Sequence, residues 1–599
     1  MASFPTSTKQ PIAVTHYSNL DLSSQHITTG NFMEFNVAKA MELCPRQSID
    51  INMRTFARLA PMPLPTYGNA DIKNRAYFVP FRTVMQGWNE FIDDTTFVSS
   101  NGPCIPVVPE MSALELMTMF TGNAFSSVVD DMNTCDFVHI SSLGVHTARN
   151  FTPYGRHTYK LLCSLGYRVI FDERSIGTFS MSALPLLCLL KVYFDWYYPS
   201  SYTDDARANE IKYILNFPAT DDPVEFYDFF DRDKMALVFS LLYRVCYDSD
   251  YFVSAWDNPV APNNDAYSNI RITDPTSSNP DYAIGGLNGS NGTPEINANS
   301  TITQYALDAL KSVNDYMRRH QLAGARVLDR YLSRWGIRLP DAALDRSVFI
   351  GESISKINFG DVTSTTDSFS SESRSGAVLG SYAGKGIGDN VANGLVSYTS
   401  DEFGMLIIVS TIIPKTAYYQ GMDRCTFHVS RFDFYTPEFD NLGTQAIATR
   451  ELYVPIHQLD DGDEATGINY DRAVFGFTPR FAEYKKGYDN ITGDLVLRSK
   501  NVGLEGWTLM RDVSHYFDPR NGSAYADVVH DQDFVEADDA WQYNRIFYTT
   551  DQQEDKFYII HNFNIQSRFP GKTLYDSYEF KDYDKAEKVH IDVNGVRAN

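Results

Sequence analysis

The sequence lacks closely spaced cysteines and a long apolar run. Its seven cysteines are an odd number, and no two of them form a C-x-x-C pair. Scattered thiols argue against a disulfide framework, and they predict reduced side chains in a cytosolic assembly environment. The most apolar run, residues 183–198, is broken by Pro185, Lys191 and Asp195 and is too short to cross a bilayer. The first residues show no basic region before an apolar run, so we expect neither a signal peptide nor membrane insertion.

Recognisable catalytic, cofactor and metal motifs are also absent. The glycine-rich run 380–388 has three residues between Gly380 and the Gly384-Lys385 pair, whereas a phosphate-binding loop needs four and then Ser or Thr. We interpret it as a flexible loop. The acidic run 460–464 lacks the spacing of a calcium-binding loop and is interpreted as a solvated turn. We therefore expect no enzyme, no cofactor and no metal site. A pair of carboxylates that meet only in space is invisible in a sequence, which leaves a carbohydrate-active enzyme open.

Charged residues are scarce and mostly acidic. They make up 21% of the chain, and the formal net charge is −24. Proteins that bind nucleic acid by themselves are usually basic, so this balance argues against a stand-alone nucleic-acid binder but allows a local basic face. If the protein encloses nucleic acid, another component should supply much of the neutralising charge.

Aromatic residues are abundant, with 37 Tyr and 39 Phe in 599 residues. Aromatic side chains favour strands and broad contact surfaces. Together with the low charge, this composition indicates a chain that hides much of its surface against other chains. A large β-rich core is the alternative explanation.

Residues 52–92 are dense in aromatics, prolines and arginines. Pro61, Pro63 and Pro65 favour an extended path because each ring fixes φ and restrains the preceding residue. We expect a core strand over 72–80 and a short amphipathic helix over 84–92. The arginines of this stretch, Arg54, Arg58, Arg75 and Arg82, are candidates for interface or nucleic-acid contacts.

Other segments are assigned from periodicity and composition. We expect strands over 33–37, 405–413, 425–430, 474–477 and 557–560, and helices over 185–197 and 204–215. Residues 1–30 are polar and are expected to form an arm that becomes ordered against neighbouring chains. Residues 263–299 and 364–400 are rich in small polar residues and glycine, so both are expected to form long loops, the first as a surface insertion or protrusion.

Several blocks spread over the chain resemble the major capsid proteins of the Microviridae, small icosahedral bacteriophages with single-stranded DNA, and within them the gokushovirus-like branch. Each block is short, but their number and order make the resemblance specific. The blocks include the proline-rich segment 56–65, Arg75-Ala-Tyr-Phe-Val-Pro80, Asp195-Trp196-Tyr197, Asp250-Tyr-Phe-Val-Ser-Ala255, Ser347-Val-Phe-Ile-Gly351, Arg431-Phe-Asp-Phe-Tyr435 and Arg480-Phe-Ala-Glu-Tyr484.

The resemblance implies a mainly β fold: a single eight-stranded jelly roll of the viral capsid type, with long loop insertions containing several α-helices. It divides the chain into an N-terminal arm (1–30), a jelly-roll capsid domain (31–599) and a variable surface insertion (260–300). It implies about sixty copies in a closed T=1 shell. The shell would enclose a circular single-stranded DNA genome together with a small basic internal DNA-binding protein, and a pilot or spike protein is a further partner. The chain would be part of the virion and would assemble in the host bacterial cytoplasm.

The variable insertion falls where the gokushovirus-like relatives form a protrusion. We expect its side chains to face a bacterial surface receptor, and the candidates are Tyr267, Tyr282, Asn288 and Asn291. A β-rich carbohydrate-active enzyme and a phage receptor-binding spike are the alternative functions. The lack of a signal peptide counts against the first alternative, and the lack of internal repeats counts against the second.

Overall fold

The computed structural model describes a large part of the 599-residue chain. The described residues are 17–99, 102–112, 135–141, 144–151, 153–168, 179–199, 206–216, 242, 244–256, 312, 315, 331–333, 335–338, 340, 345–363, 382–431, 433–440, 444–454, 474–496, 504–517, 530, 532–536, 538–549 and 554–571.

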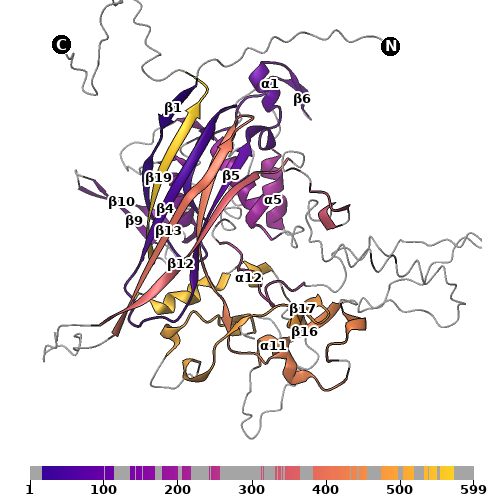
Figure 1. Cartoon of the computed structure of the whole chain (residues 1–599). Coiled ribbons are helices and arrows are strands. Elements are labelled where there is room, and N and C mark those ends of the chain that lie inside the picture. Colours follow the sequence, from indigo (N-terminus) through magenta and orange to yellow (C-terminus); the bar gives the residue numbers. More distant parts are fainter. Residues whose placement is uncertain are drawn as a thin grey trace, which may run out of the picture.

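One large antiparallel sheet organises the molecule (Figure 1). Its strands are β1 (Ser18–Asp21), β2 (Ser24–Gly30), β3 (Asn36–Leu43), β4 (Ser48–Leu59), β5 (Ala70–Pro80), β12 (Val348–Thr363), β13 (Tyr382–Thr399), β14 (Gly404–Pro414) and β19 (Phe557–Phe569). The neighbour order is β1-β19-β4-β13-β12-β5-β14-β3, and β2 also pairs with β19. Since β1 and β2 share one edge of β19, nine strands occupy eight positions.

The strand order is that of a jelly roll. When the eight positions are numbered along the chain, the neighbours read 1-8-3-6-5-4-7-2. This is two four-stranded halves joined by Greek-key connections. The expected mainly β class is therefore confirmed. The two longest connections hold most of the remaining chain: residues 81–347 join β5 to β12, and residues 415–556 join β14 to β19.

The strands β4 and β19 form because apolar and polar side chains alternate along them. In β4, Ile49, Ile51 and Met53 are buried, whereas the residues between them are exposed. In β19, Phe563 and Ile565 are buried in the same way. A period of two places one set of side chains on each face of a strand. The buried set meets residues of β3, β5, β13 and β14 to form a core inside the curled sheet.

A second layer covers the outer face of β3, β14 and β5. Helix α3 (Pro153–Leu165) packs on β3, and α4 (Leu184–Val192) packs on β5 and β14. All eleven residues of β14 are buried because the strand has the inner core on one face and this helical layer on the other. The turn η2 (Tyr193–Tyr197) continues α4 and stacks Tyr197 edge-on against Phe35. The sequence predicts the helix over 185–197 correctly.

Short elements fill the connections. The strands are β6 (Phe97–Ser99), β7 (Gly102–Cys104), β8 (Glu110–Ser112), β9 (Cys135–Ser141), β10 (Gly144–Phe151), β11 (Ser180–Ser182), β15 (Ala417–Tyr418), β16 (Thr444–Ala448), β17 (Val474–Pro479) and β18 (Asp489–Asn490). The helices are η1 (Phe81–Thr83), α1 (Trp88–Asp93), α5 (Ala206–Leu215), η5 (Arg424–Phe427), η6 (Pro437–Phe439), α11 (Thr449–Leu452), η7 (Ala482–Tyr484), η8 (Gly493–Leu495), η9 (Glu505–Trp507), η10 (Ser514–Phe517), α12 (Gln532–Val535) and η12 (Asp538–Ile546).

The predicted loop over 364–400 was wrong from residue 382 onward, because this segment forms β13 between β12 and β4. Its glycines allow close packing, and they are not there to make a loop flexible. A Cβ on Gly386 would lie 2.5 Å from Cδ2 of Leu59, and one on Gly388 would lie 2.5 Å from Cδ1 of Ile72. These distances are too short for any larger residue without a shift of the neighbours. The glycine-rich run is thus a strand where other side chains approach the backbone closely.

Three other predictions need correction. Residues 424–427 form the turn η5 instead of a strand, and Val429 after it is exposed. The helix expected over 84–92 is only α1, which starts at Trp88. Met33 lies in a turn with φ of 62°, so β3 starts at Asn36. In addition, residues 18–30, which the sequence assigns to the arm, form β1 and β2 against the chain's own β19.

A buried charge cluster joins the start of β3, helix α3 and the segment before β19. Lys160 Nζ lies 3.1 Å from Glu34 Oε2 and 3.1 Å from Asp555 Oδ1. Asn31 donates from its backbone and its side-chain amide to Glu34. Burial alone would raise the pKa of Glu34, but Lys160 and these hydrogen bonds lower this pKa to about 2. The carboxylate is therefore ionised at neutral pH and depends on its partners.

We expect Lys160→Met to lower the free energy of unfolding by about 3–5 kcal/mol, because Glu34 would then be a buried carboxylate without its cation. Urea unfolding at pH 7 measures this loss. The control is Lys356→Met at an exposed position of β12, for which we expect a change within about 0.5 kcal/mol. The double variant Glu34→Gln/Lys160→Met should recover part of the loss. Wild-type stability of Lys160→Met would show that the cluster does not hold these segments together.

Candidate assembly and nucleic-acid interface

The described residues include an open sheet surface and a cavity. Among them, no three His, Cys, Asp or Glu side chains are grouped so that they could hold a metal ion. In the same part of the chain, no helix is long and apolar enough to cross a membrane. The features that bear on function are an exposed sheet face and a cavity lined by arginines.

The outer face of β2, β19, β4 and β13 has no helical cover in the described part of the chain. It lies on the side of the sheet away from α5 (Figure 1). We call it the arginine face. It comprises Gln25, Ile27, Asn52, Arg54, Phe56, Arg58, Asp389, Tyr558, Ile560, Asn562 and Asn564, which are outward-facing and exposed or partly exposed.

Arg54 projects from β4 on this face. Its guanidinium donates to Asp389 on β13 through two bonds, Nε to Oδ1 at 3.1 Å and Nη2 to Oδ2 at 2.8 Å. Both side chains are well exposed, at 59% and 40%. Solvent screens such a pair strongly, so it contributes little to stability. Its effect is to orient the guanidinium on the face.

Arg58 and the rings beside it form the apolar part of the arginine face. Its guanidinium lies over the ring of Phe56, with 5.5 Å between the charge and the ring centre. The strand register then places Tyr558 beside Arg58, and Ile560 between Phe56 and Ile27. Ile27 is 66% exposed and Tyr558 is 52% exposed. Exposed aromatic rings next to arginine are typical of surfaces that bind single-stranded nucleic acid or another protein.

The other two predicted arginines are not part of this face. Arg75 is half-buried on β5 and donates to Glu352 on β12 at 2.8 Å, on the side where Tyr197 packs. Arg82 in η1 forms ion pairs with Asp345 and with Glu402, the latter at 2.8 Å. Both arginines therefore connect segments within the subunit. The predicted receptor-facing residues Tyr267, Tyr282, Asn288 and Asn291 lie outside the described residues.

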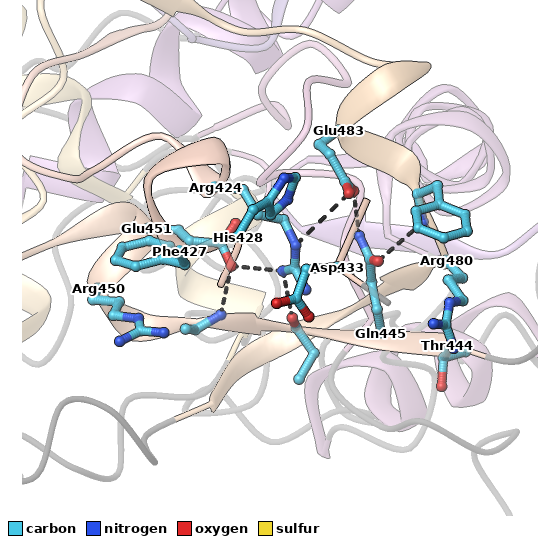
Figure 2. A pocket seen from close by; sticks show the side chains of 13 residues that line it. Arg424, Phe427, His428, Asp433, Thr444, Gln445, Arg450, Glu451, Arg480 and Glu483 are labelled. Atoms are coloured by element: carbon cyan, nitrogen blue, oxygen red, sulfur yellow. Dashed lines mark hydrogen bonds and ion pairs between the residues drawn. The ribbon is translucent and has the colours of Figure 1, made fainter. Parts of the chain in front are cut away.

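A cavity of about 250 Å³ lies in the 415–556 connection (Figure 2). Its walls come from η5 and the loop after it, from β16 with α11, and from the segment around Phe481. The lining residues are Arg424, Phe427, His428, Asp433, Thr444, Gln445, Ala446, Ala448, Arg450, Glu451, Arg480, Phe481 and Glu483.

Arg424 occupies the centre of the cavity wall, with its guanidinium between two carboxylates (Figure 2). Its Nη1 lies 2.7 Å from Glu451 Oε1, and its Nε lies 3.9 Å from Glu483 Oε1. Tyr251 donates its hydroxyl to the other oxygen of Glu451 at 3.0 Å. Burial raises the pKa of Glu451, and Arg424 opposes that change. Burial outweighs this opposition, so the pKa of Glu451 stays raised, and the ion pair connects η5 to α11.

Exposed apolar side chains lie beside the cavity, since Phe434 packs on His428 and Tyr435 packs on Phe481, and both partners line it. We call residues 422–435 the exposed loop. Val429 is 92% exposed, Phe434 is 53% exposed and Tyr435 is 44% exposed, and nearby Tyr484 packs against Tyr435. Contiguous exposed apolar groups on a soluble chain mark a surface that another molecule covers.

Sequence reasoning missed the cavity. Its residues come from segments separated by up to 59 positions, from Arg424 to Glu483, and no single segment carries a recognised pattern. The blocks Arg431–Tyr435 and Arg480–Tyr484, which support the resemblance, border it. Those blocks are the signal in the sequence that could have led to it.

Comparison with known proteins gives one matching family model. Residues 9–140 and 175–566 match the family described as capsid protein (F protein). The match includes every strand of the large sheet except the last residues of β19. The match therefore covers both ends of the chain that form the sheet as well as most of the connections between its strands.

Individual relatives carry the name capsid protein VP1. The chain is 26% identical to that of Chlamydia phage 1 over 37% of this chain and 35% of the relative. It is 25% identical to that of Spiroplasma virus 4 over 32% of each chain. It is 32% identical to that of Bdellovibrio phage phiMH2K over 13% of each chain. The matched part thus spans about a third of the length of the first two relatives. The predicted resemblance to Microviridae capsid proteins is confirmed.

The arrangement around Arg424 predicts a specific stability defect. Arg424→Met removes the charged partner of Glu451, and we expect a loss of about 1.5–3 kcal/mol, the usual value of a hydrogen bond to a charged group. Hydrogen exchange followed by mass spectrometry should show lower protection in residues 444–452. The exposed Arg431 of the same loop provides the control, Arg431→Met, which should leave that segment protected. Equal protection in both variants would contradict the assigned role of Arg424.

Proposed function

The chain belongs to the capsid protein (F protein) family, and from this premise we propose that about sixty copies assemble into a closed T=1 shell around a circular single-stranded DNA genome. As a major capsid protein, the chain is a structural component of the virion. The family match over almost the whole described chain is the observation that carries the proposal.

The arginine face is the surface proposed to meet the genome. It presents Arg54 and Arg58 beside the partly exposed ring of Phe56 and the exposed ring of Tyr558, in a chain whose net charge is −24. Guanidiniums pair with phosphates, and flat rings stack with unpaired bases without demanding a sequence. The amides of Asn562, Asn564 and Gln25 add hydrogen-bonding groups along the same strands. This combination supports contacts with a single-stranded polymer of any sequence.

The exposed loop is proposed to contact a neighbouring subunit. Its side chains Val429, Phe434 and Tyr435 are too apolar to be left in water. Interfaces between subunits are enriched in aromatic residues and arginine, and the arginine-lined cavity beneath the loop adds polar groups to the same surface. This surface supports self-assembly, the mechanism by which a capsid protein acts.

The other partners are proposed from the family and from the acidic net charge of the chain. A small basic internal protein is proposed to neutralise much of the genome, because this chain is acidic overall. The insertion at 260–300 is proposed to face a bacterial surface receptor, and a pilot or spike protein is a further partner. Assembly is proposed to occur in the host bacterial cytoplasm, and the chain is proposed to have no catalytic activity.

The mass of the particles formed by the expressed chain tests the shell. Sixty copies of a 67.8 kDa chain give about 4 MDa for a closed T=1 shell. Native mass spectrometry should show this species, and electron micrographs should show isometric particles. A chain that stays at 67.8 kDa in infected or expressing cells would refute the proposal.

Single-residue changes test the arginine face. We expect Arg54→Ala and Arg58→Ala to leave the unfolding midpoint of the subunit unchanged, because both side chains are exposed. Both variants should reduce the DNA that purified particles protect from nuclease. Arg338→Ala, at an exposed arginine outside the sheet, is the matched control and should retain wild-type DNA content. Normally filled particles from both arginine-face variants would contradict this assignment.

A further inference from the structure

A layer of polar side chains crosses the interior of the barrel between its apolar ends. Asn74 on β5 donates from its side-chain amide to Thr55 Oγ1 on β4 at 3.1 Å. Thr55 Oγ1 in turn lies 3.0 Å from Nδ1 of His561 on β19. Two strands, β13 and β12, separate β4 from β5 in the sheet, so the first bond spans the barrel. All three residues are fully buried.

The direction of the Thr55–His561 bond depends on the tautomer of His561, because the Thr55 hydroxyl has one proton and two lone pairs. We take the tautomer in which Thr55 accepts from Asn74 and donates its own proton to Nδ1 of His561. His561 is then neutral and carries its proton on Nε2, which is buried and has no partner among the described residues. The imidazole of His26 on β2 is bound to the carbonyl of Ala38, which leaves its Nδ1 as a buried acceptor that also lacks a partner.

The two imidazoles face each other. His26 and His561 are register partners on β2 and β19, with ring centres 6.0 Å apart and planes 26° apart. Each ring keeps one buried nitrogen that has no partner among the described residues, and burial disfavours the charged form of an imidazole. Neutral rings therefore fit this position well. Two protonated rings would place like charges directly opposite each other on paired strands, which is destabilising.

The pair lies beside the seam where the two edges of the barrel meet. β2 is hydrogen-bonded to β19, and β3 is hydrogen-bonded to β14. Side chains join β2 to β3 across the seam. Lys39 Nζ on β3 donates to Ser24 Oγ on β2 at 2.9 Å and lies 5.9 Å from the ring centre of Phe563. The bond from His26 to the carbonyl of Ala38 is the second bridge.

The charged groups that act on the two rings are positive. They are Lys39 on β3 and Arg168 after α3. The buried cluster of Glu34, Lys160 and Asp555 lies at the other end of β2, beyond Thr29, and is ion-paired within itself. No carboxylate appears among the described groups that stabilise a charge on His26 or His561.

We propose that His26 and His561 form an acid-sensitive latch, in which neutral rings hold β2 in the barrel and protonated rings open the β2–β3 seam and free the N-terminal strands. Protonation of His561 also makes Nδ1 a donor, so the Thr55 hydroxyl proton must turn away from it while Thr55 Oγ1 accepts from both His561 and Asn74. The latch is a property of the subunit fold and does not depend on which surface meets the genome.

The pH range follows from the direction of the shifts. Burial lowers the pKa of His26 from 6.5, and burial together with His26 lowers the pKa of His561 to about 3. His26 and His561 therefore bind protons at a higher pH when their segment is open than when the barrel is closed. The stabilisation by neutral rings is complete above pH 6.5 and declines as the pH falls from 6.5 towards about 3.

Hydrogen exchange of the full-length chain between pH 7 and 4, corrected for the intrinsic effect of pH on exchange, tests the latch. We expect peptides that cover β2 and residues 557–563 to lose protection as the pH falls, while β14 stays protected. In His561→Asn, the amide oxygen still accepts the Thr55 hydroxyl but cannot be protonated, so the loss of protection with acid should shrink. His428→Asn, outside the barrel, is the matched control and should behave like the wild type.

Two results would overturn the proposal. One is constant protection of β2 in the wild type down to pH 4. The other is the same acid response in His561→Asn as in the wild type. If His561→Asn does not fold, the titration midpoints of the two histidines are measured in the wild-type chain from the exchange of their imidazole C2 hydrogens. Midpoints of His26 and His561 below 6.5 support the latch, and a midpoint at or above 6.5 for His561 refutes it.

Discussion

Backbone pairing on both edges of β19 is the interaction on which the structure depends. Residues 557–563 pair with β2 and residues 566–569 pair with β1 on one edge, while residues 557–568 pair with β4 on the other. This ladder brings the last strand of the barrel between the first strands of the chain. Because β19 holds the first strands of the chain beside β4 in this way, the connections of 81–347 and 415–556 can be long without weakening the sheet. A chain without β19 would lose one of the eight positions and with it the closed interior.

The two sides of the curled sheet differ in whether helices cover them. Helices α3 and α4 cover β3, β14 and β5, so all residues of β14 are buried. The strands β2, β19, β4 and β13 keep their outer side chains accessible, and Arg54, Arg58 and Tyr558 are among them. One side of the sheet is thus covered by helices of the same chain, and the other side stays accessible for the contacts that we propose. The interior is also divided, because the polar layer of Asn74, Thr55 and His561 separates two apolar cores.

Some of this organisation could be predicted from local patterns. The continuous apolar run 405–413 indicated a strand buried on both faces, and the buried face of α4 followed from its leucines. β13 could not be predicted, since Gly386 and Gly388 suggest a loop until Leu59 and Ile72 from other strands are seen beside them.

The alternation over 425–430 indicated a strand, but Arg424 pairs with Glu451 and the segment turns instead. Arg54 and Arg58 were predicted as interface or nucleic-acid contacts, and the fold places both at exposed positions. The partners of Arg75 and Arg82 are distant in sequence and required the fold. The polar layer inside the barrel was missed for the same reason.

A reconstruction of the purified particle by electron cryomicroscopy tests the central claim most directly, because it shows the symmetry, the subunit contacts and the orientation of the sheet together. The account predicts an icosahedral T=1 shell in which β4 and β19 turn Arg54, Arg58 and Tyr558 towards the DNA and residues 422–435 contact a neighbouring subunit. A shell with the arginine face directed outward to solvent, or a particle without this chain in its wall, would contradict it.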